Sequence, residues 1–163
     1  MTLRLAASIL ALAFVAAGCD STDPLTPVTC ADAPLSVQDI SVTTSQAANQ
    51  GSFVSVRYVG RLTNGAAFDS TRAGAVASFS LQQVVTGFRL GIGGTDAFPE
   101  AQVPEIAPMR LGSRRIITIP PNLGYGGVPL TDQNGNVILN SAGTPLIPAC
   151  STLIFDVTLV DID

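Results

Sequence analysis

Three stretches in which apolar and polar residues alternate place the tightest constraint on the fold of this chain. They span residues 52–62, 113–119 and 151–162, and shorter strand-like stretches occupy 35–43 and 76–81. A period of two puts alternate side chains on opposite faces of a strand. Only QQVVTGFRLGI resembles a helix, and Gly87 and Gly91 interrupt it. The pattern predicts an α+β domain, an antiparallel sheet of five to six strands wrapped on one short helix.

Local signals predict some of the connections and pairings. Asn64-Gly65 follows the first long strand, and this dipeptide favours a two-residue hairpin turn. The adjacent Arg114 and Arg115 fall in an alternating stretch, so they are predicted to lie on opposite faces of one strand. Asp156 lies inside the last strand, where we expect a structural role and a pairing with one of two arginines, Arg57 or Arg61.

The composition excludes several classes of function. The chain has no histidine and no lysine, and all eight of its basic residues are arginines. Without histidine there is no Ser-His-Asp or Cys-His nucleophile and no HExxH zinc site. Without lysine there is no P-loop lysine and no Schiff base. The formal net charge of −4 argues against a nucleic-acid surface. We therefore expect no cofactor, no metal ion and no nucleic-acid partner.

The N-terminal residues have the layout of an export signal. Residues 1–18 contain a positive charge at Arg4 and an apolar stretch at 5–17, which together predict a signal peptide. The sequence Ala16-Ala17-Gly18-Cys19 resembles a bacterial lipobox, in which Cys19 is lipidated and becomes the first mature residue. Ordinary cleavage after a small residue is the alternative.

Export predicts where the mature protein is found. Residues 19–34 are rich in Pro, Thr, Ser and Asp and are predicted to form a tether, followed by a domain at 35–163. We expect an extracytoplasmic lipoprotein, anchored to a membrane by its lipid, in a bacterial periplasm or at the cell surface. If Cys19 carries lipid, Cys30 and Cys150 remain as a pair, which we expect to form a disulfide. Two separate thiols are the alternative.

Four stretches, in order, resemble the FKBP-type peptidyl-prolyl isomerases. They are VRYVGRLTNGAAFDSTR at 56–72, VVTGF at 84–88, MRLGSRRIITIPPNLGYG at 109–126 and STLIFDVTLVDI at 151–162. The resemblance covers nearly all of residues 35–163. It implies an FKBP-like fold and catalysis of cis–trans isomerisation at X-Pro bonds. This reaction breaks no covalent bond, so it requires neither histidine nor lysine.

The resemblance also implies a set of site residues. Tyr58, Asp69 and Tyr125 would be the catalytic group, with Asp69 orienting rather than transferring a proton. The Val85 N–H would donate to a substrate carbonyl, and the Tyr125 hydroxyl to another. Other members of the set would form an apolar cup for the prolyl ring or its rim: Phe68, Val84, Val85, Phe88, Leu146, Ile147 and Phe155.

The chain also departs from the family pattern. Phe88 stands where the floor of the cup is commonly Trp, and Ala77 stands where an aromatic wall residue is often found. Gly74 occupies the position of an arginine that pairs in some members with the residue matching Asp69. Two loops, 93–107 and 127–149, have no close family counterpart; the second lies where a substrate-covering flap is expected and allows one small hairpin.

Together these features predict an exported isomerase whose partners are proline-containing polypeptides. A macrolide is a further candidate ligand under the resemblance. Two alternatives stay open at this point. One is a noncatalytic peptide-binding or chaperone module that keeps the pocket without turnover. The other is a structural surface domain, in which the protein's own side chains would fill the cup.

Overall fold

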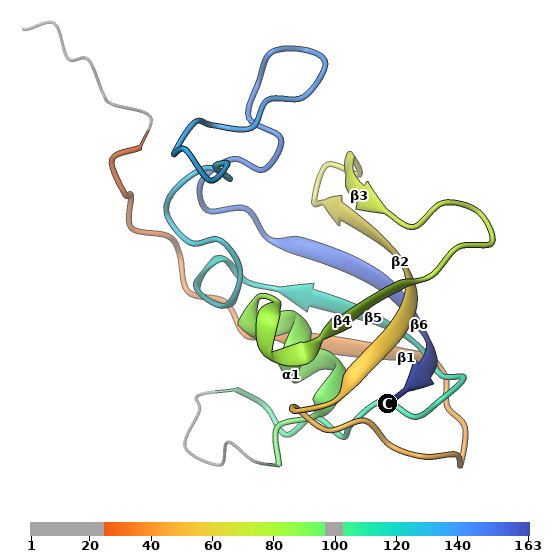
Figure 1. Ribbon diagram of the computed structural model, residues 1–163. Helices are drawn as coiled ribbons and strands as arrows, with labels where there is room; N and C mark the ends of the chain where they lie inside the picture. Colours follow the sequence, from red (N-terminus) through yellow and green to blue (C-terminus); the bar gives the residue numbers. More distant parts are fainter. Residues whose placement is uncertain (1–24, 97–102) are drawn as a thin grey trace, which may run out of the picture.

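In a computed structural model, which describes residues 25–96 and 103–163, six strands form one antiparallel sheet beside a single α-helix (Figure 1). The order across the sheet is β1-β5-β6-β2-β3, and β4 pairs with the first half of β2. The predicted fold class is confirmed. The bounds are β1 (Ser36–Ser41), β2 (Phe53–Leu62), β3 (Ala67–Ser70), β4 (Ala77–Ser80), η1 (Leu81–Gln83), α1 (Thr86–Gly93), β5 (Arg114–Ile119), η2 (Pro121–Leu123) and β6 (Leu153–Ile162).

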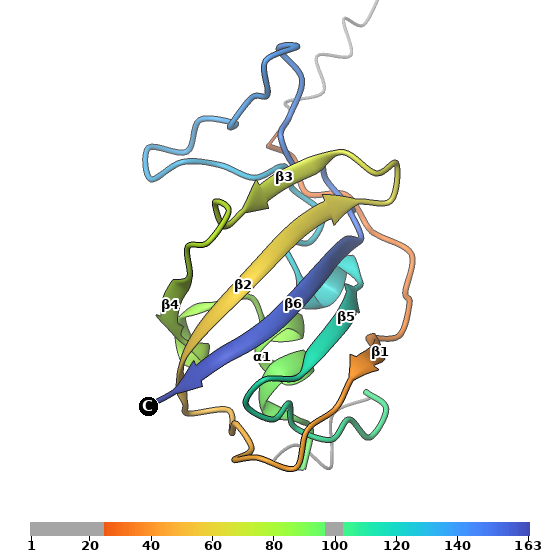
Figure 2. The ribbon, with the colours of Figure 1, turned by 90° about the vertical axis from the view of Figure 1, so that its right-hand side faces the viewer.

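The alternating residues of the long strands build the core on the face of the sheet that α1 covers (Figure 2). The buried members of β2, β5 and β6 are Val54, Val56, Ile117, Ile119, Leu153, Phe155, Val157 and Leu159. Helix α1 contributes Phe88, Leu90 and Ile92 to this core. Burial of so many apolar side chains on one face is the main favourable term in folding.

The turn between β2 and β3 differs from the prediction. The Gly65 N–H donates to the Leu62 carbonyl at 2.9 Å, and the Leu62 N–H donates to the Ala66 carbonyl at 2.9 Å. The loop therefore has three residues, 63–65, and the predicted two-residue turn is wrong. Gly65 has a φ of 86°, the left-handed conformation that the last position of a three-residue hairpin loop requires.

β2 pairs with two strands along one edge, and the backbone of Tyr58 lies at the gap between them. β4 pairs with Phe53–Val56 and β3 with Val59–Arg61. Between them, the Thr71 N–H donates to the Tyr58 carbonyl at 3.1 Å, and the Tyr58 N–H donates to Thr71 Oγ1 at 3.2 Å. The backbone of Tyr58 is thus held where β3 and β4 separate.

A disulfide joins Cys30 to Cys150, as predicted. The signal peptide and Cys19 lie outside the described residues, as does the start of the predicted tether. From Leu25 onward the tether lies against the domain, and Val28 donates a backbone hydrogen bond to Gly127. Within the described part of the chain, no helix is long and apolar enough to cross a bilayer.

The long loop 127–149 contains the small hairpin that the sequence allows, and a second small turn follows it. The Asp132 carboxylate accepts from the N–H groups of Asn134 and Asn136, and a bridge pairs Thr131 with Val137. The Asn140 side chain closes the second turn by accepting from the Ala142 N–H. Such bonds from Asp and Asn to nearby backbone order a loop locally. Of the other predicted loop, 97–102 lie outside the described residues.

Candidate active site

Aromatic rings from five elements converge on the core face of the sheet. Phe155 of β6 is their centre, with its ring centroid 4.8 Å from that of Phe88, 5.4 Å from Phe68 and 6.0 Å from Tyr58. Phe79 of β4 packs edge-on against Phe88 at 5.7 Å. Edge-to-face contacts at these distances stabilise the cluster beyond the burial of its area. The rings form a cup rather than a filled core, because a cavity remains beside them.

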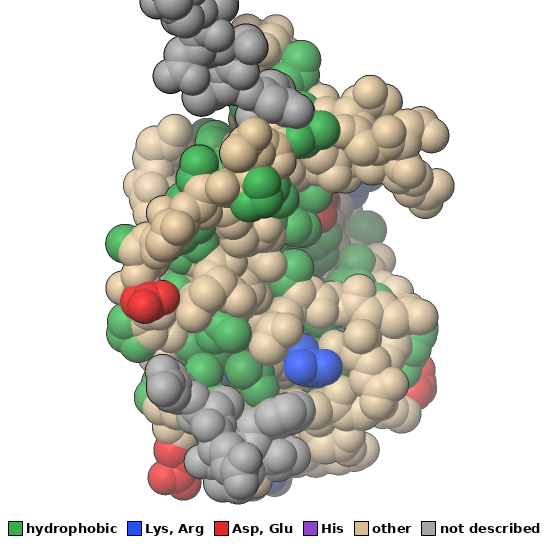
Figure 3. Space-filling model, turned by 90° about the vertical axis from the view of Figure 1, so that its left-hand side faces the viewer, with side chains coloured by type: hydrophobic (Ala, Val, Ile, Leu, Met, Phe, Trp, Pro, Cys, Tyr) green, Lys and Arg blue, Asp and Glu red, His purple; other side chains and the backbone are tan. Residues whose placement is uncertain are grey.

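The cavity has a volume of about 340 Å³ and lies next to this aromatic cluster. On this side of the molecule the surface is hollowed below the projecting loop, with hydrophobic side chains around the hollow (Figure 3). Among the residues that line it, Asp69 is the only one with a charge, as far as the described chain shows. A concave apolar site with a few polar groups is typical of ligand binding. The lining consists of Tyr58, Asp69, Phe79, Gln83, Val84, Val85, Phe88, Tyr125 and Phe155.

Tyr58 and Asp69 meet at the lip of the cavity. The Tyr58 hydroxyl donates to Asp69 Oδ2, and the Ser70 N–H donates to Oδ1 at 2.8 Å. Burial raises the pKa of Tyr58 well above its usual range, and the hydrogen bond to the Asp69 carboxylate raises that pKa further. The phenol therefore stays protonated at neutral pH and acts as a donor. In return it fixes the direction of the carboxylate.

Tyr125 faces this pair from the turn after η2. Its side chain lines the cavity, although 38% of the residue remains exposed. Burial raises the pKa of Tyr125, and the negative charge of Asp69 raises it as well. Its hydroxyl is thus a protonated donor beside the carboxylate.

Val84 and Val85 link η1 to α1 and form the wall of the cavity next to Phe88. Val85 is the N-cap residue of α1, and its carbonyl accepts from the N–H groups of Phe88 and Arg89 at 3.0 and 3.2 Å. The N–H of an N-cap residue lies outside the hydrogen-bond ladder of its helix. The Val85 N–H is therefore suited to donate to a ligand in the cavity.

Most of the predicted site residues come together here, but three do not line the cavity. Phe68 packs edge-on against Phe155, which lines the cavity. Ile147 is 1% exposed and belongs to the core, and Leu146 packs against that core. The reason is the long loop, whose Leu130 N–H binds the Ile147 carbonyl and draws this segment inward.

Two lining residues, Phe79 and Gln83, are absent from the predicted set. Phe79 lies two residues after Ala77 on β4, so both point to the same face of the sheet. Phe79 therefore supplies an aromatic wall although Ala77 does not. The alternation at 76–81 was the signal that could have identified it. Gln83 has no such signal, because it lies in the short η1 turn.

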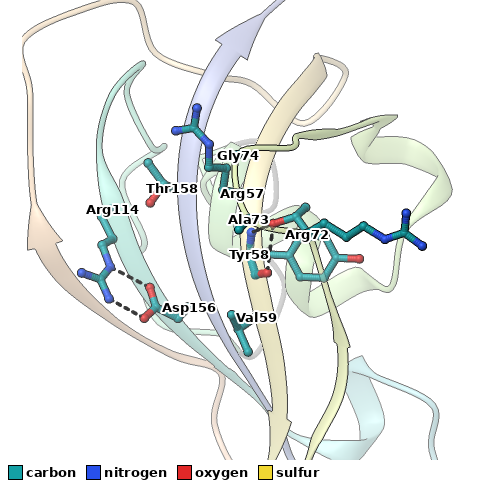
Figure 4. Close-up of a pocket in the computed structure, with 10 residues that line it drawn as sticks. Arg57, Tyr58, Val59, Arg72, Ala73, Gly74, Arg114, Asp156 and Thr158 are labelled. Carbon is teal, nitrogen blue, oxygen red and sulfur yellow. Dashed lines mark hydrogen bonds and ion pairs between the residues drawn. The ribbon is translucent and has the colours of Figure 1, made fainter.

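A second hollow, of about 250 Å³, lies on the opposite, outer face of the sheet. Here Arg114 and Asp156 form a bidentate ion pair at 2.8 and 2.6 Å (Figure 4). The predicted pairing of Asp156 with Arg57 or Arg61 is wrong. β5 lies beside β6 and places Arg114 opposite Thr158, two residues from Asp156 along the strand. Arg57 and Arg72 point away from each other, so this hollow gathers no converging charge (Figure 4).

The Arg114–Asp156 pair predicts a pH-dependent contribution to stability. The hydrogen bond from Arg114 lowers the pKa of Asp156 below its usual value in the folded protein. The pair therefore stabilises the fold above the unfolded pKa, near 3.9, and this stability is lost as the pH falls through the lower folded value. We expect Arg114→Gln to lower the free energy of unfolding slightly at pH 7, because the pair is exposed.

Urea unfolding at pH 7 and at pH 3 measures this effect. The difference between Arg114→Gln and the wild type should shrink as the pH falls. Arg57→Gln is the control, because Arg57 lines the same hollow and forms no ion pair with a described residue. A difference that stays constant with pH would contradict the assignment of the lowered pKa to this pair.

No three residues of the metal-binding types come close together within 25–96 and 103–163. The chemistry available in the cavity is therefore that of its rings, two phenols, a carboxylate and a backbone N–H.

Residues 44–160 match the sequence profile of a family described as FKBP-type peptidyl-prolyl cis-trans isomerase. FK506-binding protein 4 of Neurospora crassa is 36% identical over 130 residues, which are 78% of this chain and 22% of that protein. FK506-binding protein 4 of Dictyostelium discoideum is 31% identical over 146 residues, 89% of this chain and 33% of that protein. The chain spans a fifth to a third of the length of these relatives.

Solved structures show the same similarity. The crystal structure of AtFKBP13 superposes with a TM-score of 0.63 at 31% identity, covering 79% of this chain and 93% of that one. FkpA from Escherichia coli gives a TM-score of 0.56 at 29% identity, covering 79% of this chain and 48% of that one.

Proposed function

This chain belongs to the family of FKBP-type peptidyl-prolyl cis-trans isomerases, and we propose that its domain catalyses the isomerisation of X-Pro bonds in polypeptides. One observation supports the proposal above all others. An open apolar cavity of about 340 Å³ is lined by aromatic rings and has a hydrogen-bonded tyrosine and carboxylate at its lip. A proline ring is apolar and small enough to enter such a space.

The residues of the cavity account for a mechanism without proton transfer. Rotation about an X-Pro bond is opposed by resonance between the carbonyl and the nitrogen, with a barrier of about 18–20 kcal/mol. A prolyl ring held in the cup between Phe88 and Phe155 is removed from water. Because water favours the planar, polar amide, this removal favours the twisted form. Donors such as the Val85 N–H and the Tyr125 hydroxyl can hold the flanking carbonyls in the twisted form. Interactions stronger in that form than in either planar isomer accelerate the reaction.

Removal of the Asp69 carboxylate tests this mechanism. Asp69→Ala leaves the Tyr58 hydroxyl without its acceptor, so both groups at the lip lose their orientation. We expect kcat/KM to fall about ten- to a hundredfold, because a hydrogen bond to a charged group contributes roughly 1.5–3 kcal/mol. The measurement is the isomerisation rate of an Ala-Leu-Pro-Phe peptide.

Asp161→Ala is the matched control. It removes the same charge from the far end of β6, outside the cavity, and should leave the rate unchanged. If Asp69→Ala isomerises the peptide as fast as the wild type, the lip has no part in the reaction.

A noncatalytic peptide-binding module is the second candidate, favoured by Phe88 in place of the common Trp at the floor. The same peptide separates the two functions. Binding measured by tyrosine fluorescence without any acceleration of isomerisation would support the module. If the domain neither binds the peptide nor accelerates its isomerisation, the result would support a structural domain. A macrolide that competes with the peptide would identify the cavity as the shared site.

We also propose that the protein is exported and held at a membrane by lipid on Cys19. The leader with its lipobox-like sequence supports this, and so does the bond between Cys30 and Cys150, because disulfides persist in oxidising compartments. Its substrates would then be proline-containing polypeptides outside the cytoplasm. Mass spectrometry of the mature N-terminus should find a diacylglyceryl group on Cys19. An unmodified terminus, or one that retains residues 1–18, would contradict the proposal.

A further inference from the structure

The turn that carries Tyr125 is held from two sides by segments distant in sequence. The Val28 N–H donates to the Gly127 carbonyl at 2.9 Å, and the Cys150 N–H donates to the Gly126 carbonyl at 2.9 Å. The disulfide between Cys30 and Cys150 closes this arrangement over 120 residues of chain. We call residues 25–30 the strap. In Figure 1 the strap, in orange, runs beside the cyan turn after β5.

The strap lies directly on the turn. A Cβ atom at Gly127 would be 1.9 Å from the Val28 carbonyl oxygen, so only glycine allows the two backbones to approach so closely. Gly126, the residue after Tyr125, has a φ of 73° and donates to the Pro121 carbonyl at 2.9 Å. The direction of the Tyr125 side chain therefore depends on a turn whose following residues are fixed by the strap.

The disulfide is the covalent connection between the strap and the rest of the domain. Val28 is 53% exposed and Leu25 is 39% exposed, so the strap buries little apolar surface of its own. A chain segment near a terminus with so little burial loses order unless it is tied down. Loss of the disulfide would release the strap and, with it, one of the contacts that hold the Tyr125 turn.

We propose that the Cys30–Cys150 disulfide and the strap are positioning elements of the active site, which hold the Tyr125 hydroxyl where it can donate to a bound X-Pro peptide. This inference rests on the proposed isomerase function. It assigns to the disulfide a role in catalysis beyond stabilising the fold.

A double-mutant cycle tests the coupling between the disulfide and Tyr125. With the disulfide intact, Tyr125→Phe should lower kcat/KM about fivefold, the effect of one lost hydrogen bond. In a Cys30→Ser/Cys150→Ser background the same change should cost less than twofold, because the hydroxyl is no longer in place. Tyr58→Phe is the control. Because Tyr58 is held by β2 and Thr71, Tyr58→Phe should lower kcat/KM by the same factor with and without the disulfide.

A second measurement needs no enzymatic activity. The chain has two tyrosines and no tryptophan, so the absorbance of Tyr58→Phe at alkaline pH reports Tyr125 alone. With the disulfide intact, Tyr125 should ionise above the ordinary tyrosine value near 10. When Cys30→Ser/Cys150→Ser is added, its pKa should fall toward that value, because the ring leaves the cavity. Gly127→Ala, which displaces the strap while both cysteines remain, should shift the pKa in the same direction.

The outcomes separate this inference from the proposed function. The positioning role would be overturned if Tyr125→Phe lowered kcat/KM by the same factor with and without the disulfide and the Tyr125 pKa stayed unchanged. This holds even if the protein is an active isomerase. A wild type without isomerase activity would overturn the proposed function, and the titration would still decide whether the disulfide positions Tyr125. Circular dichroism establishes that each variant is folded before either measurement.

Discussion

Arg115→Met should lower the free energy of unfolding by about 3–5 kcal/mol, because it removes four hydrogen bonds donated by a buried guanidinium. Arg115 is 3% exposed, and its guanidinium reaches three separate segments. Nε and Nη2 donate to the Asp39 carboxylate of β1 at 2.6 and 3.0 Å, and Nη1 donates to the carbonyls of Gly91 and Ala107 at 2.8 Å each. Methionine fills similar space but donates no hydrogen bond.

The hydrogen bond to the buried Gly91 carbonyl accounts for much of this expected cost. The Asp39 side chain is 38% exposed, so its carboxylate can bind water after the substitution. The Gly91 carbonyl belongs to the last turn of α1, where carbonyls have no partner within the helix. Of the two carbonyls, that of Gly91 is buried, and a buried acceptor left without a donor costs roughly 1–3 kcal/mol. A positive charge at the C-terminal end of a helix is also favourable, and methionine removes it.

Urea unfolding followed by circular dichroism measures the loss. Arg114→Met is the matched control, one residue earlier on the same strand, because Arg114 lies on the outer face and forms an exposed pair with Asp156. Arg114→Met should lower the free energy of unfolding only slightly. Arg115→Lys should fall between the two, because one ammonium group cannot reach both carbonyls and both carboxylate oxygens. Equal losses for Arg114→Met and Arg115→Met would refute the argument.

The alternation in the sequence was sufficient to predict the main strands. Val54 and Val56 of β2 and Leu153 and Val157 of β6 are buried as the period of two requires. The same period placed Arg114 and Arg115 on opposite faces, which is confirmed. It could not identify their partners, because the neighbours of a strand depend on the order of the sheet. Asp156 was therefore paired with the wrong arginine.

In the candidate site, too, the residues on regular elements could be predicted from the sequence and the residues in loops could not. Residues on regular elements, such as Phe88 of α1 and Phe155 of β6, lie beside the cavity because the fold determines their direction. Leu146 and Ile147 come from a loop whose path depends on its own hydrogen bonds, and no pattern in the sequence specifies that path. The disulfide was predicted from the number of cysteines. Its contact with the Tyr125 turn could not be, because it depends on the close approach of Val28 to Gly127.

The glycines of α1 explain how the floor of the cup is placed. In the sequence, Gly87 and Gly91 interrupt the helical pattern. In the structure they lie four residues apart on the face that meets β5, and a Cβ at either would be 2.3 Å from Ile119 Cγ2 or 2.6 Å from Ile117 Cγ2. Their lack of a side chain lets α1 lie close to the sheet. That approach sets the depth of Phe88, which follows Gly87 directly.

Gly87→Ala should therefore destabilise the protein, although alanine favours a helix by about 1 kcal/mol over glycine. The added methyl group overlaps Ile119 and forces α1 away from β5, and such overpacking costs about 1–3 kcal/mol. The shift also moves Phe88 and Val85, so kcat/KM should fall more than the loss of stability alone explains. Urea unfolding and the peptide assay measure the two effects.

A compensating change shows whether the overlap with Ile119 is the cause. Ile119→Ala alone should cost about 2–5 kcal/mol by leaving a cavity. Combined with Gly87→Ala, the new methyl group occupies part of that cavity, so the double variant should be more stable than the sum of the two losses predicts, by about 1 kcal/mol or more. Gly51→Ala is the control, because a Cβ there meets only side chains, the nearest Asn49 at 3.3 Å. Strict additivity of Gly87→Ala and Ile119→Ala would mean that α1 does not depend on this contact for its position, and that something else sets the depth of Phe88.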